Sequence, residues 1–149
     1  MALFREYDIR GIVDKELTES VAEQIGRAYA TMAADRGAKT VSVGRDGRLS
    51  SPALRDHLVK GLTAGGLHVV DIGVCPTPIL YFSLFHLKVD GGIMITGSHN
   101  AAEYNGFKMC IGKDAIYGED IQHLRKIVEG GTFRSGSGTV SERLIIPDY

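Results

Sequence analysis

The order of hydrophobic and polar residues along the chain predicts helices that alternate with short strands. Apolar residues recur at helical spacing in four segments, so helices are expected over residues 18–36, 51–64, from 77 onward, and 121–128. Short runs of apolar and β-branched residues predict strands over residues 40–43, 68–72, 91–96 and 106–111. Glycines close several of these segments, as at Gly37, Gly44 and Gly65. The chain therefore divides into successive strand and helix units.

Capping residues indicate where three of the helices begin. Thr18 precedes the first helix and is predicted to cap it. Ser51 and Thr77 are each followed by proline, the residue favoured at the first helical position, so each is predicted to be an N-cap. The helix after Thr77 is predicted to be a core helix from four large apolar side chains, Ile79, Leu80, Phe82 and Phe85.

The alternation of strands and helices predicts an α/β fold. Crossover helices between parallel strands cover both faces of a sheet, so we expect a three-layer α/β/α arrangement around a mixed, mostly parallel sheet of about four strands. No room exists for a helix between residues 96 and 107, which predicts that strand 106–111 is an antiparallel edge strand. Residues 144–147 predict one more short strand, running directly into the end of the chain like a linker. Residues 1–149 are predicted to form a single domain.

Charge and composition narrow the classes of partner. The 17 Lys and Arg residues against 18 Asp and Glu leave a net charge of −1, which argues against nucleic acid or an anionic membrane as partners. The longest uncharged run, residues 72–87, contains two prolines and is shorter than the ~20 residues of a membrane-spanning helix. The charged N-terminal segment is unlike a signal peptide, and Cys75 and Cys110 are expected to be buried reduced thiols. These features predict a cytoplasmic protein.

The most unusual polar segment follows the apolar strand 91–96. Thr96-Gly97-Ser98-His99-Asn100 places two hydroxyls, an imidazole and an amide directly after a strand, where α/β sheets bind ligands. Such residues also make an ordinary turn. Three functional readings compete: a P-loop, a serine hydrolase, and a serine that carries phosphate.

Spacing weakens the first two readings. The interval from Gly92 to Gly97 fits a P-loop, but Ser98 stands where the motif requires lysine. Adjacent Ser98 and His99 are badly placed for a catalytic Ser–His hydrogen bond, and no Gly-x-Ser-x-Gly elbow surrounds the serine. A phosphoserine instead needs cations and donors around it. The candidates for this role are Arg10, Arg45, His99 and Lys108.

Four motifs in order resemble the α-D-phosphohexomutases, especially the bacterial phosphomannomutase/phosphoglucomutase group. They are Phe4-Arg5-Glu6-Tyr7-Asp8-Ile9-Arg10-Gly11, Val43-Gly44-Arg45-Asp46-Gly47-Arg48, Pro76-Thr77-Pro78, and Thr96-Gly97-Ser98-His99-Asn100 followed by Tyr104-Asn105-Gly106-Phe107-Lys108. The resemblance covers essentially the whole chain. One departure is that Ala101-Ala102 stand where the family commonly has proline.

The resemblance implies a phosphorylated serine and a set of residues around it. Ser98 would carry the phosphoryl group, and one of its phosphate oxygens would ligate Mg²⁺. Arg10, His99 and Lys108 would surround the phosphate, with Lys108 or His99 as the base, and Tyr7 would lie near the catalytic cleft. His99 could alternatively orient other groups, Tyr7 could serve packing, and Arg45 and Asp46 could form a structural ion pair.

The implied reaction interconverts hexose 1-phosphates and 6-phosphates of mannose or glucose through a bisphosphorylated sugar. The family supplies its Mg²⁺ carboxylates from an Asp-x-Asp-x-Asp loop and reads the sugar with a Gly-Glu-x-Ser-Gly-His loop, and neither pattern occurs here. The chain resembles only the first of four family domains, so its partners would be the remaining mutase domains. We expect the isolated chain to fold without turning over substrate. A stand-alone phosphate- or nucleotide-binding module without catalysis is the alternative.

Overall fold

A computed structural model describes residues 3–145 and 147. The described elements follow the order expected of an α/β chain, with strands and helices alternating through most of its length. The helices are α1 (Glu19–Asp35), α2 (Ser51–Ala64), α3 (Thr77–His86) and α4 (Glu119–Gly130). The strands are β1 (Ile9–Ile12), β2 (Thr40–Arg45), β3 (His68–Val74), β4 (Gly91–Ile95), β5 (Tyr104–Ile111), β6 (Asp114–Ala115) and β7 (Val140–Glu142).

The strands of the described chain form one mixed sheet in the order β1-β5-β4-β2-β3-β7, with β6 paired to β5. Strands β4, β2, β3 and β7 are joined by parallel pairs, whereas β5 runs antiparallel to β4, β1 and β6. The predicted mixed, mostly parallel sheet is confirmed. The expected number of about four strands is too low, and β5 is an interior strand rather than an edge strand because β1 pairs with its outer side.

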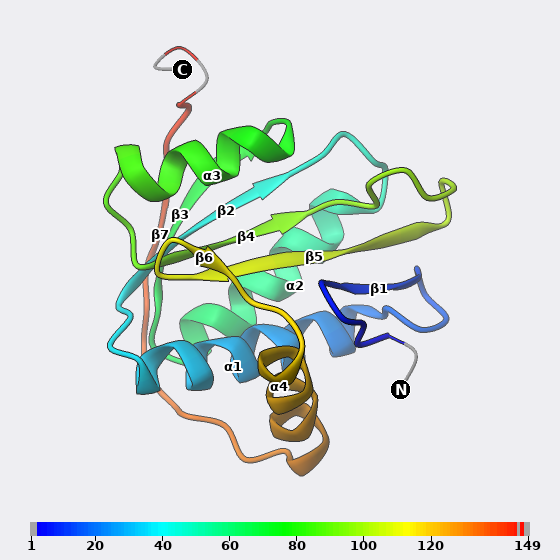
Figure 1. The fold of residues 1–149 in the computed structure, drawn as a ribbon, viewed down its shortest axis with the longest axis horizontal. Helices are drawn as coiled ribbons and strands as arrows, with labels where there is room; N and C mark the ends of the chain where they lie inside the picture. The colour runs from blue at the N-terminus through cyan, green and yellow to red at the C-terminus, as the bar shows by residue number, and fades with distance from the viewer. Residues whose placement is uncertain (1–2, 146, 148–149) are drawn as a thin grey trace.

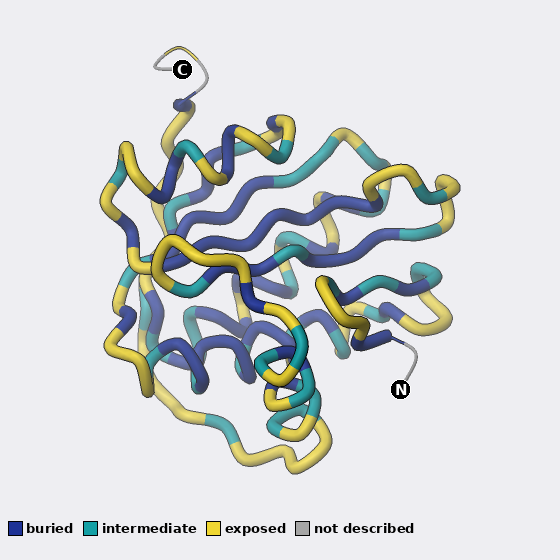
Figure 2. Tube along the Cα trace, in the orientation of Figure 1, coloured by how far each residue is buried: buried dark blue, intermediate teal, exposed yellow. Residues whose placement is uncertain are grey.

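Helices cover both faces of the sheet, as predicted for a three-layer α/β/α arrangement (Figure 1). Side chains alternate between the two faces along each strand, so neighbouring residues of β4 enter different cores. Ile93 and Ile95 join the core formed with α1, α2 and α4, whereas Met94 packs in the core formed with α3. The central strands are accordingly buried and the connecting loops exposed (Figure 2).

The predicted helix starts are confirmed in one of three cases. The Thr18 hydroxyl oxygen accepts the Val21 N–H at 3.1 Å and caps α1. Ser51 and Thr77 are wrong as N-caps, because each lies inside its helix and the capping residues are Ser50 and Pro76. The Ser51 hydroxyl is used in a contact outside the helix instead, which is described below with the site.

Helix α3 is less deeply buried than its apolar sequence predicts. Ile79 and Leu80 are buried against the sheet, as expected. Phe82 is half-buried and stacks on His86, and Phe85 is 62% exposed beneath the ammonium group of Lys113. Only one side of α3 faces the sheet, so apolar residues around its whole circumference cannot all be buried.

The C-terminal strand lies earlier than predicted. β7 comprises Val140–Glu142 and pairs in parallel with β3, whereas Leu144 and Ile145 lie outside any strand. Residue 146 of the predicted strand lies outside the described residues. Within this segment Ile145 is buried with Ile72 and Met94, whereas Leu144 is 77% exposed.

Two further expectations can be compared with the described chain. None of its helices has the length and apolar character needed to span a bilayer. Cys75 and Cys110 are both buried and are not joined in a disulfide. Burial raises the pKa of the Cys110 thiol to about 11, which keeps it protonated near neutral pH.

Candidate active site

A pocket with both charged and apolar lining residues lies over the part of the sheet formed by β1 and β5. These strands pair so that Ile9 faces Phe107 and Arg10 faces Gly106. Ile9 and Phe107 are buried in the core with α1, so the alternation of side chains places Arg10 and Lys108 on the opposite face. Helix α3 packs mainly over β2 and β4, which leaves this face of β1 and β5 accessible.

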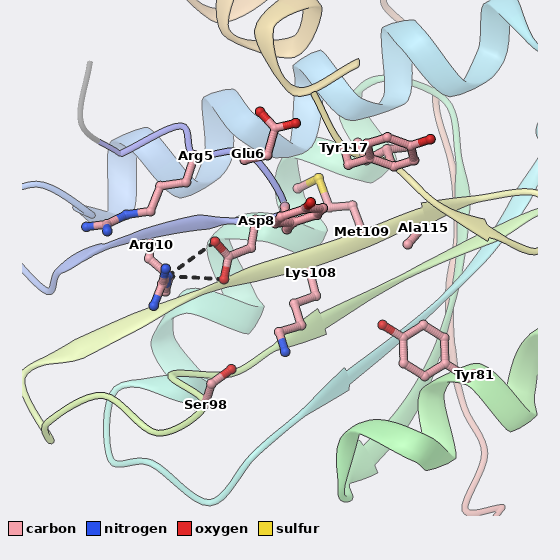
Figure 3. Close-up of a pocket in the computed structure, with 12 residues that line it drawn as sticks. Arg5, Glu6, Asp8, Arg10, Tyr81, Ser98, Lys108, Met109, Ala115 and Tyr117 are labelled. Atoms are coloured by element: carbon pink, nitrogen blue, oxygen red, sulfur yellow. Dashed lines mark hydrogen bonds and ion pairs between the residues drawn. The ribbon is translucent and has the colours of Figure 1, made fainter. Parts of the chain in front are cut away.

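The pocket has a volume of about 590 Å³ and brings together residues from five segments of the chain. Its walls are Arg5, Glu6, Tyr7, Asp8, Arg10, Tyr81, Ser98, Lys108, Met109, Ala115, Ile116 and Tyr117. Figure 3 shows the Ser98 hydroxyl and the Lys108 ammonium group directed into the same space. One pocket is therefore lined by four of the residues predicted from the sequence: Tyr7, Arg10, Ser98 and Lys108. His99 is exposed and is not among the residues that line the pocket.

Ser98 has an unusual backbone conformation. Its φ angle is +54°, in the left-handed region that L-residues rarely adopt. The Ser98 N–H donates to the Thr96 hydroxyl oxygen at 2.9 Å. Asn100 closes the turn, because its backbone N–H and its side-chain amide both donate to the Gly97 carbonyl at 3.0 Å. The loop is thus ordered by its own polar side chains and holds Ser98 exposed at its tip.

Arg48 gathers the carbonyl groups of the same loop. Its Nη1 donates to the carbonyls of Ala101 at 2.7 Å and Tyr104 at 3.0 Å. Its Nη2 donates to the carbonyls of Asn100 at 2.8 Å and Ser98 at 3.1 Å. The side chain of Arg48 is only 17% exposed, and a Cβ at residue 97 would collide with its guanidinium carbon, so only glycine fits there.

Asp46 holds the start of the loop. Its carboxylate accepts the N–H groups of Gly97 and Arg48, both at 3.1 Å, and the Ser51 hydroxyl at 2.8 Å. Burial by itself would raise the pKa of this carboxyl group. The hydrogen bonds from Ser51, Arg48, Gly97 and Thr96 outweigh burial and hold the pKa below its ordinary value. Asp46 is therefore a stable anion that connects β2 and α2 to the Ser98 loop.

Buried Asn105 adds a second connection between the loop and α2. Its amide donates to the hydroxyl oxygens of Ser50 at 2.8 Å and Ser51 at 3.1 Å. Ser51 thus links Asn105 to Asp46. This explains why Ser51 does not cap α2 through its side chain: its hydroxyl is committed to Asp46 and Asn105.

The cations expected near a phosphate differ in their partners. Arg10 forms an ion pair of 3.2 Å with Asp8 inside the pocket (Figure 3). The Lys108 ammonium group has no hydrogen-bond or ion-pair partner in the described part of the chain. Arg45 was also a candidate, and this prediction is wrong, because its guanidinium pairs with Asp71 at 3.3 Å and does not line the pocket. The expected ion pair of Arg45 with Asp46 is likewise not formed: Asp46 pairs with Arg48 at 3.3 Å.

Aromatic side chains flank the pocket. Tyr7 is 74% exposed and Tyr117 is 61% exposed, and their ring centroids lie 6.2 Å apart. Tyr7 is therefore not a core packing residue. Tyr117 and Tyr81 were not identified in the sequence, since single tyrosines in a loop and a helix carry no distinctive pattern.

Two of the alternative readings do not fit this geometry. A P-loop leads from a strand into a helix, whereas the Ser98 loop leads from β4 into β5. A serine hydrolase needs a hydrogen bond between serine and histidine, and none joins Ser98 to His99 among the described residues. The described chain also contains no group of three or more His, Cys, Asp or Glu side chains that could hold a metal ion.

Sequence reasoning missed the role of Arg48 and underestimated that of Asp46. Both lie in the loop after β2, which is the parallel neighbour of β4. Loops at the carboxyl ends of adjacent parallel strands meet at one edge of the sheet. That rule was a usable signal for contact between residues 45–48 and the Ser98 loop.

Comparison with known proteins relates this geometry to a family of sugar-phosphate enzymes. Residues 1–135 match the family model described as phosphoglucomutase/phosphomannomutase, alpha/beta/alpha domain I. The chain is 46% identical over 149 residues to a phosphoglucomutase of Neisseria meningitidis, covering 99% of this chain and 32% of that protein. It is 45% identical over 148 residues to a phosphomannomutase/phosphoglucomutase of Pseudomonas aeruginosa, with the same two coverages.

A solved structure shares the fold closely. A phosphoglucomutase/phosphomannomutase family protein from Burkholderia thailandensis superposes with a TM-score of 0.95 at 43% identity. The match covers 99% of this chain and 34% of that chain. The chain thus spans about a third of the length of the relatives it matches.

Proposed function

The chain belongs to the phosphoglucomutase/phosphomannomutase family and corresponds to its domain I, and we propose that Ser98 carries the phosphoryl group transferred in a mutase reaction. The observation that supports this most strongly is the pocket in which Ser98 meets the cationic side chains of Arg10 and Lys108. A phosphoserine holds about −1.5 to −2 charges at neutral pH and requires such neighbours. The substrates would be hexose monophosphates of glucose, mannose or both.

The proposed reaction consists of two phosphoryl transfers. A hydroxyl oxygen of the hexose monophosphate forms a bond to the phosphorus while the bond from phosphorus to Ser98 Oγ breaks, which gives a bisphosphorylated sugar. The hydroxyl proton passes to a base, and Ser98 Oγ is left to take up a proton. After the sugar reorients, Ser98 Oγ gives its proton to a base and forms a bond to the other phosphorus, while the bond from that phosphorus to the sugar oxygen breaks and the sugar oxygen takes up a proton. Hexose 1-phosphate and 6-phosphate are thereby interconverted, and phosphoserine is restored. The sugar bisphosphate is the intermediate, and it would also act as an activator by transferring a phosphoryl group to a Ser98 that carries none.

Each pocket residue has a physical role in this proposal. The transition state of phosphoryl transfer spreads negative charge over the equatorial oxygens, so catalysis depends on in-line positioning and on nearby cations. Arg10 and Lys108 would stabilise that charge. The base is Lys108 or His99, and Lys108 is the one that lines the pocket. Exposed Tyr7 would contact the substrate at the pocket rim.

Magnesium is implied by the family resemblance, and the described chain fits it only in part. When bound, Mg²⁺ neutralises charge on the transferring phosphoryl group. Mg²⁺ takes octahedral oxygen coordination, and the described residues hold no cluster of acidic side chains that provides it. The contribution of this chain would be one phosphate oxygen on Ser98, and the other ligands would come from residues outside the described chain.

We further propose that mutase activity needs the other domains of the family. The relatives are named as phosphoglucomutase and phosphomannomutase/phosphoglucomutase for their full length, and this chain covers 32% of that length. The 149-residue chain by itself should fold without converting hexose phosphates, and measurable conversion would contradict this part of the proposal.

Two buried thiols without a disulfide support a cytoplasmic location.

The test uses a chimeric enzyme, called here the joined mutase. In it, this chain replaces the matching 148 residues of the Pseudomonas aeruginosa relative. We expect the joined mutase to convert glucose or mannose 1-phosphate to the 6-phosphate and to carry one phosphoryl group by intact mass. Ser98→Ala should abolish both, whereas Ser135→Ala, a change at an exposed loop serine, should preserve them. A folded joined mutase without turnover, or one that stays active with Ser98→Ala, would contradict the proposal.

The alternative function is a phosphate- or nucleotide-binding module without catalysis. It predicts that the 149-residue chain binds inorganic phosphate or a nucleotide with the same affinity before and after Ser98→Ala. Titration calorimetry of both forms therefore distinguishes the two functions.

A further inference from the structure

One arginine, Arg48, holds the Ser98 loop through hydrogen bonds to its backbone. Four carbonyl groups between residues 98 and 104 converge on the Arg48 guanidinium, and the Asp46 carboxylate holds the loop at Gly97. Arg48 does not line the pocket and so would not touch a substrate there. We propose that Arg48 is the positioning residue of the reaction: through these carbonyls it fixes the backbone of Ser98 and the direction of its hydroxyl. This inference rests on the proposed function.

The need for such a support follows from the conformation of Ser98. Its left-handed backbone is unfavourable for an L-residue and persists only where surrounding contacts enforce it. The loop residues Ala101 and Ala102 are exposed, so no packing holds them in place. Backbone hydrogen bonds also restrain the segment, from the Tyr104 N–H to the Ala101 carbonyl and from the Val13 N–H to the Glu103 carbonyl. The Arg48 hydrogen bonds are the side-chain contacts that tie Asn100, Ala101 and Tyr104 to the loop after β2.

Peptide geometry gives the restraint a chemical consequence. In a planar trans peptide, the carbonyl and the following N–H point in opposite directions. Because the Ser98 carbonyl turns toward Arg48, the His99 N–H turns away from the guanidinium. No acceptor for that N–H occurs in the described chain. Arg48 thereby leaves a backbone donor next to Ser98 that is available to an oxygen of a phosphoryl group on this serine.

The choice of arginine at this position is also explained by geometry. A guanidinium presents five N–H donors in a rigid planar fork, whereas a lysine ammonium presents three on a flexible stem. Four carbonyls and the Asp46 carboxylate surround the Arg48 fork. A lysine ammonium can donate hydrogen bonds to only some of these acceptors, so the loop should be less well ordered in Arg48→Lys than in the wild type.

Kinetics of the joined mutase test the positioning role. A displacement of about 1 Å at a reacting group can cost about 10²-fold in rate, so Arg48→Gln should lower kcat by about 10²-fold. KM for the hexose phosphate should stay unchanged, because Arg48 does not contact the pocket. Arg48→Lys should give an intermediate kcat. The matched control is Arg55→Gln, which removes an arginine of similar exposure, 20% against 17%, that pairs with Asp71 and Asp56 instead.

Several outcomes overturn the inference. They are an unchanged kcat in Arg48→Gln, a change confined to KM, or an equal loss in Arg55→Gln, which would indicate general destabilisation. If Arg48→Gln does not fold, Arg48→Lys is judged by the same criteria.

Solution NMR of the 149-residue chain separates this inference from the proposed function. The coupling between the Ser98 amide and α protons reports its φ angle, and amide exchange reports the order of residues 97–105. Both should change in Arg48→Gln and stay unchanged in Arg55→Gln. An unaltered loop in Arg48→Gln overturns the positioning role whatever the kinetics. An altered loop together with an inactive wild-type joined mutase contradicts the proposed function instead.

Discussion

The Gly97 N–H donates a hydrogen bond of 3.1 Å to the Asp46 carboxylate across 51 positions of sequence. Asp46 follows strand β2 and Gly97 follows strand β4, and these two strands are parallel neighbours in the sheet. The contact connects the motif after β2 to the loop that presents Ser98. An ionised carboxyl group thus adds to the hydrogen bonds with which Arg48 and Asn100 order that loop.

Asp46→Asn should lower stability in a pH-dependent way. Hydrogen bonds to charged groups contribute about 1.5–3 kcal/mol each, and partial exposure of Asp46 reduces this, so we expect a loss of about 1–2 kcal/mol at pH 7. The folded pKa of Asp46 lies below its ordinary value. Its contribution is thus fully present above about pH 4 and is lost as the pH falls through the folded pKa.

Urea unfolding of wild type and Asp46→Asn between pH 7 and pH 2 checks this expectation. The difference in unfolding free energy should narrow below about pH 4. Asp56→Asn is the control, because the Asp56 side chain is 69% exposed and should contribute little at any pH. A difference between wild type and Asp46→Asn that is constant across the whole pH range would contradict the assignment.

Gly97→Ala should destabilise the fold through a steric conflict. A Cβ at this position collides with the Arg48 guanidinium, which four carbonyls hold in place, so we expect a loss of about 1–3 kcal/mol. Gly47→Ala is the matched control, because no atom lies within 4 Å of a Cβ there. Thermal unfolding of both variants measures the difference. Equal effects at the two glycines would show that Arg48 can move freely.

Replacement of Ser98 separates stability from function. Left-handed backbone costs an L-residue roughly 1–2 kcal/mol, so Ser98→Gly should be more stable than Ser98→Ala by about 1 kcal/mol. Both variants lack the hydroxyl and should be inactive in the joined mutase. At Lys60 within helix α2, the order of glycine and alanine variants should reverse. Denaturant unfolding of the four variants measures both differences in unfolding free energy. The expectation would be refuted if the same variant, glycine or alanine, were the more stable one at both positions.

Lys108→Met should reduce turnover without reducing stability. The ammonium group has no partner to lose in the described chain, so the unfolding free energy should change by less than about 0.5 kcal/mol. Loss of a cation that stabilises the transition state should lower kcat of the joined mutase by about 10²-fold or more. The control is Lys113→Met, since Lys113 lies over the Phe85 ring outside the pocket and should leave kcat unchanged. Wild-type turnover in Lys108→Met would exclude the proposed role.

Much of the fold could be predicted from local patterns. The spacing of apolar residues located α1, α2 and the buried strands β2, β3 and β4 within a few residues. Strand β1 was missed because four residues, Ile9–Ile12, are too few to show an alternation. Strand β1 pairs with β5, which lies nearly a hundred residues later in the chain. Because of this pairing β5 is an interior strand and not the predicted edge strand.

The site was predicted in part. Ser98, Lys108, Arg10 and Tyr7 were named from their motifs, and the structure brings all four to one pocket. Arg45 was named for its charge and position after β2, yet its guanidinium turns to buried Asp71. A charged side chain pairs with the nearest opposite charge in space, and the sequence does not specify which one that is.

The α/β class, the helical and strand segments and the chemical groups after each strand all follow from local periodicity and residue type, so they can be derived from the amino-acid sequence. Which of those groups lie next to one another depends on how the strands pair. The parallel pairing of β2 with β4 brings Arg48 within hydrogen-bond distance of the Ser98 loop, and the antiparallel pairing of β1 with β5 places Arg10 and Lys108 in the same pocket. Both contacts join residues far apart in the chain, so they arise only when burial of the shared core fixes the order and register of the strands.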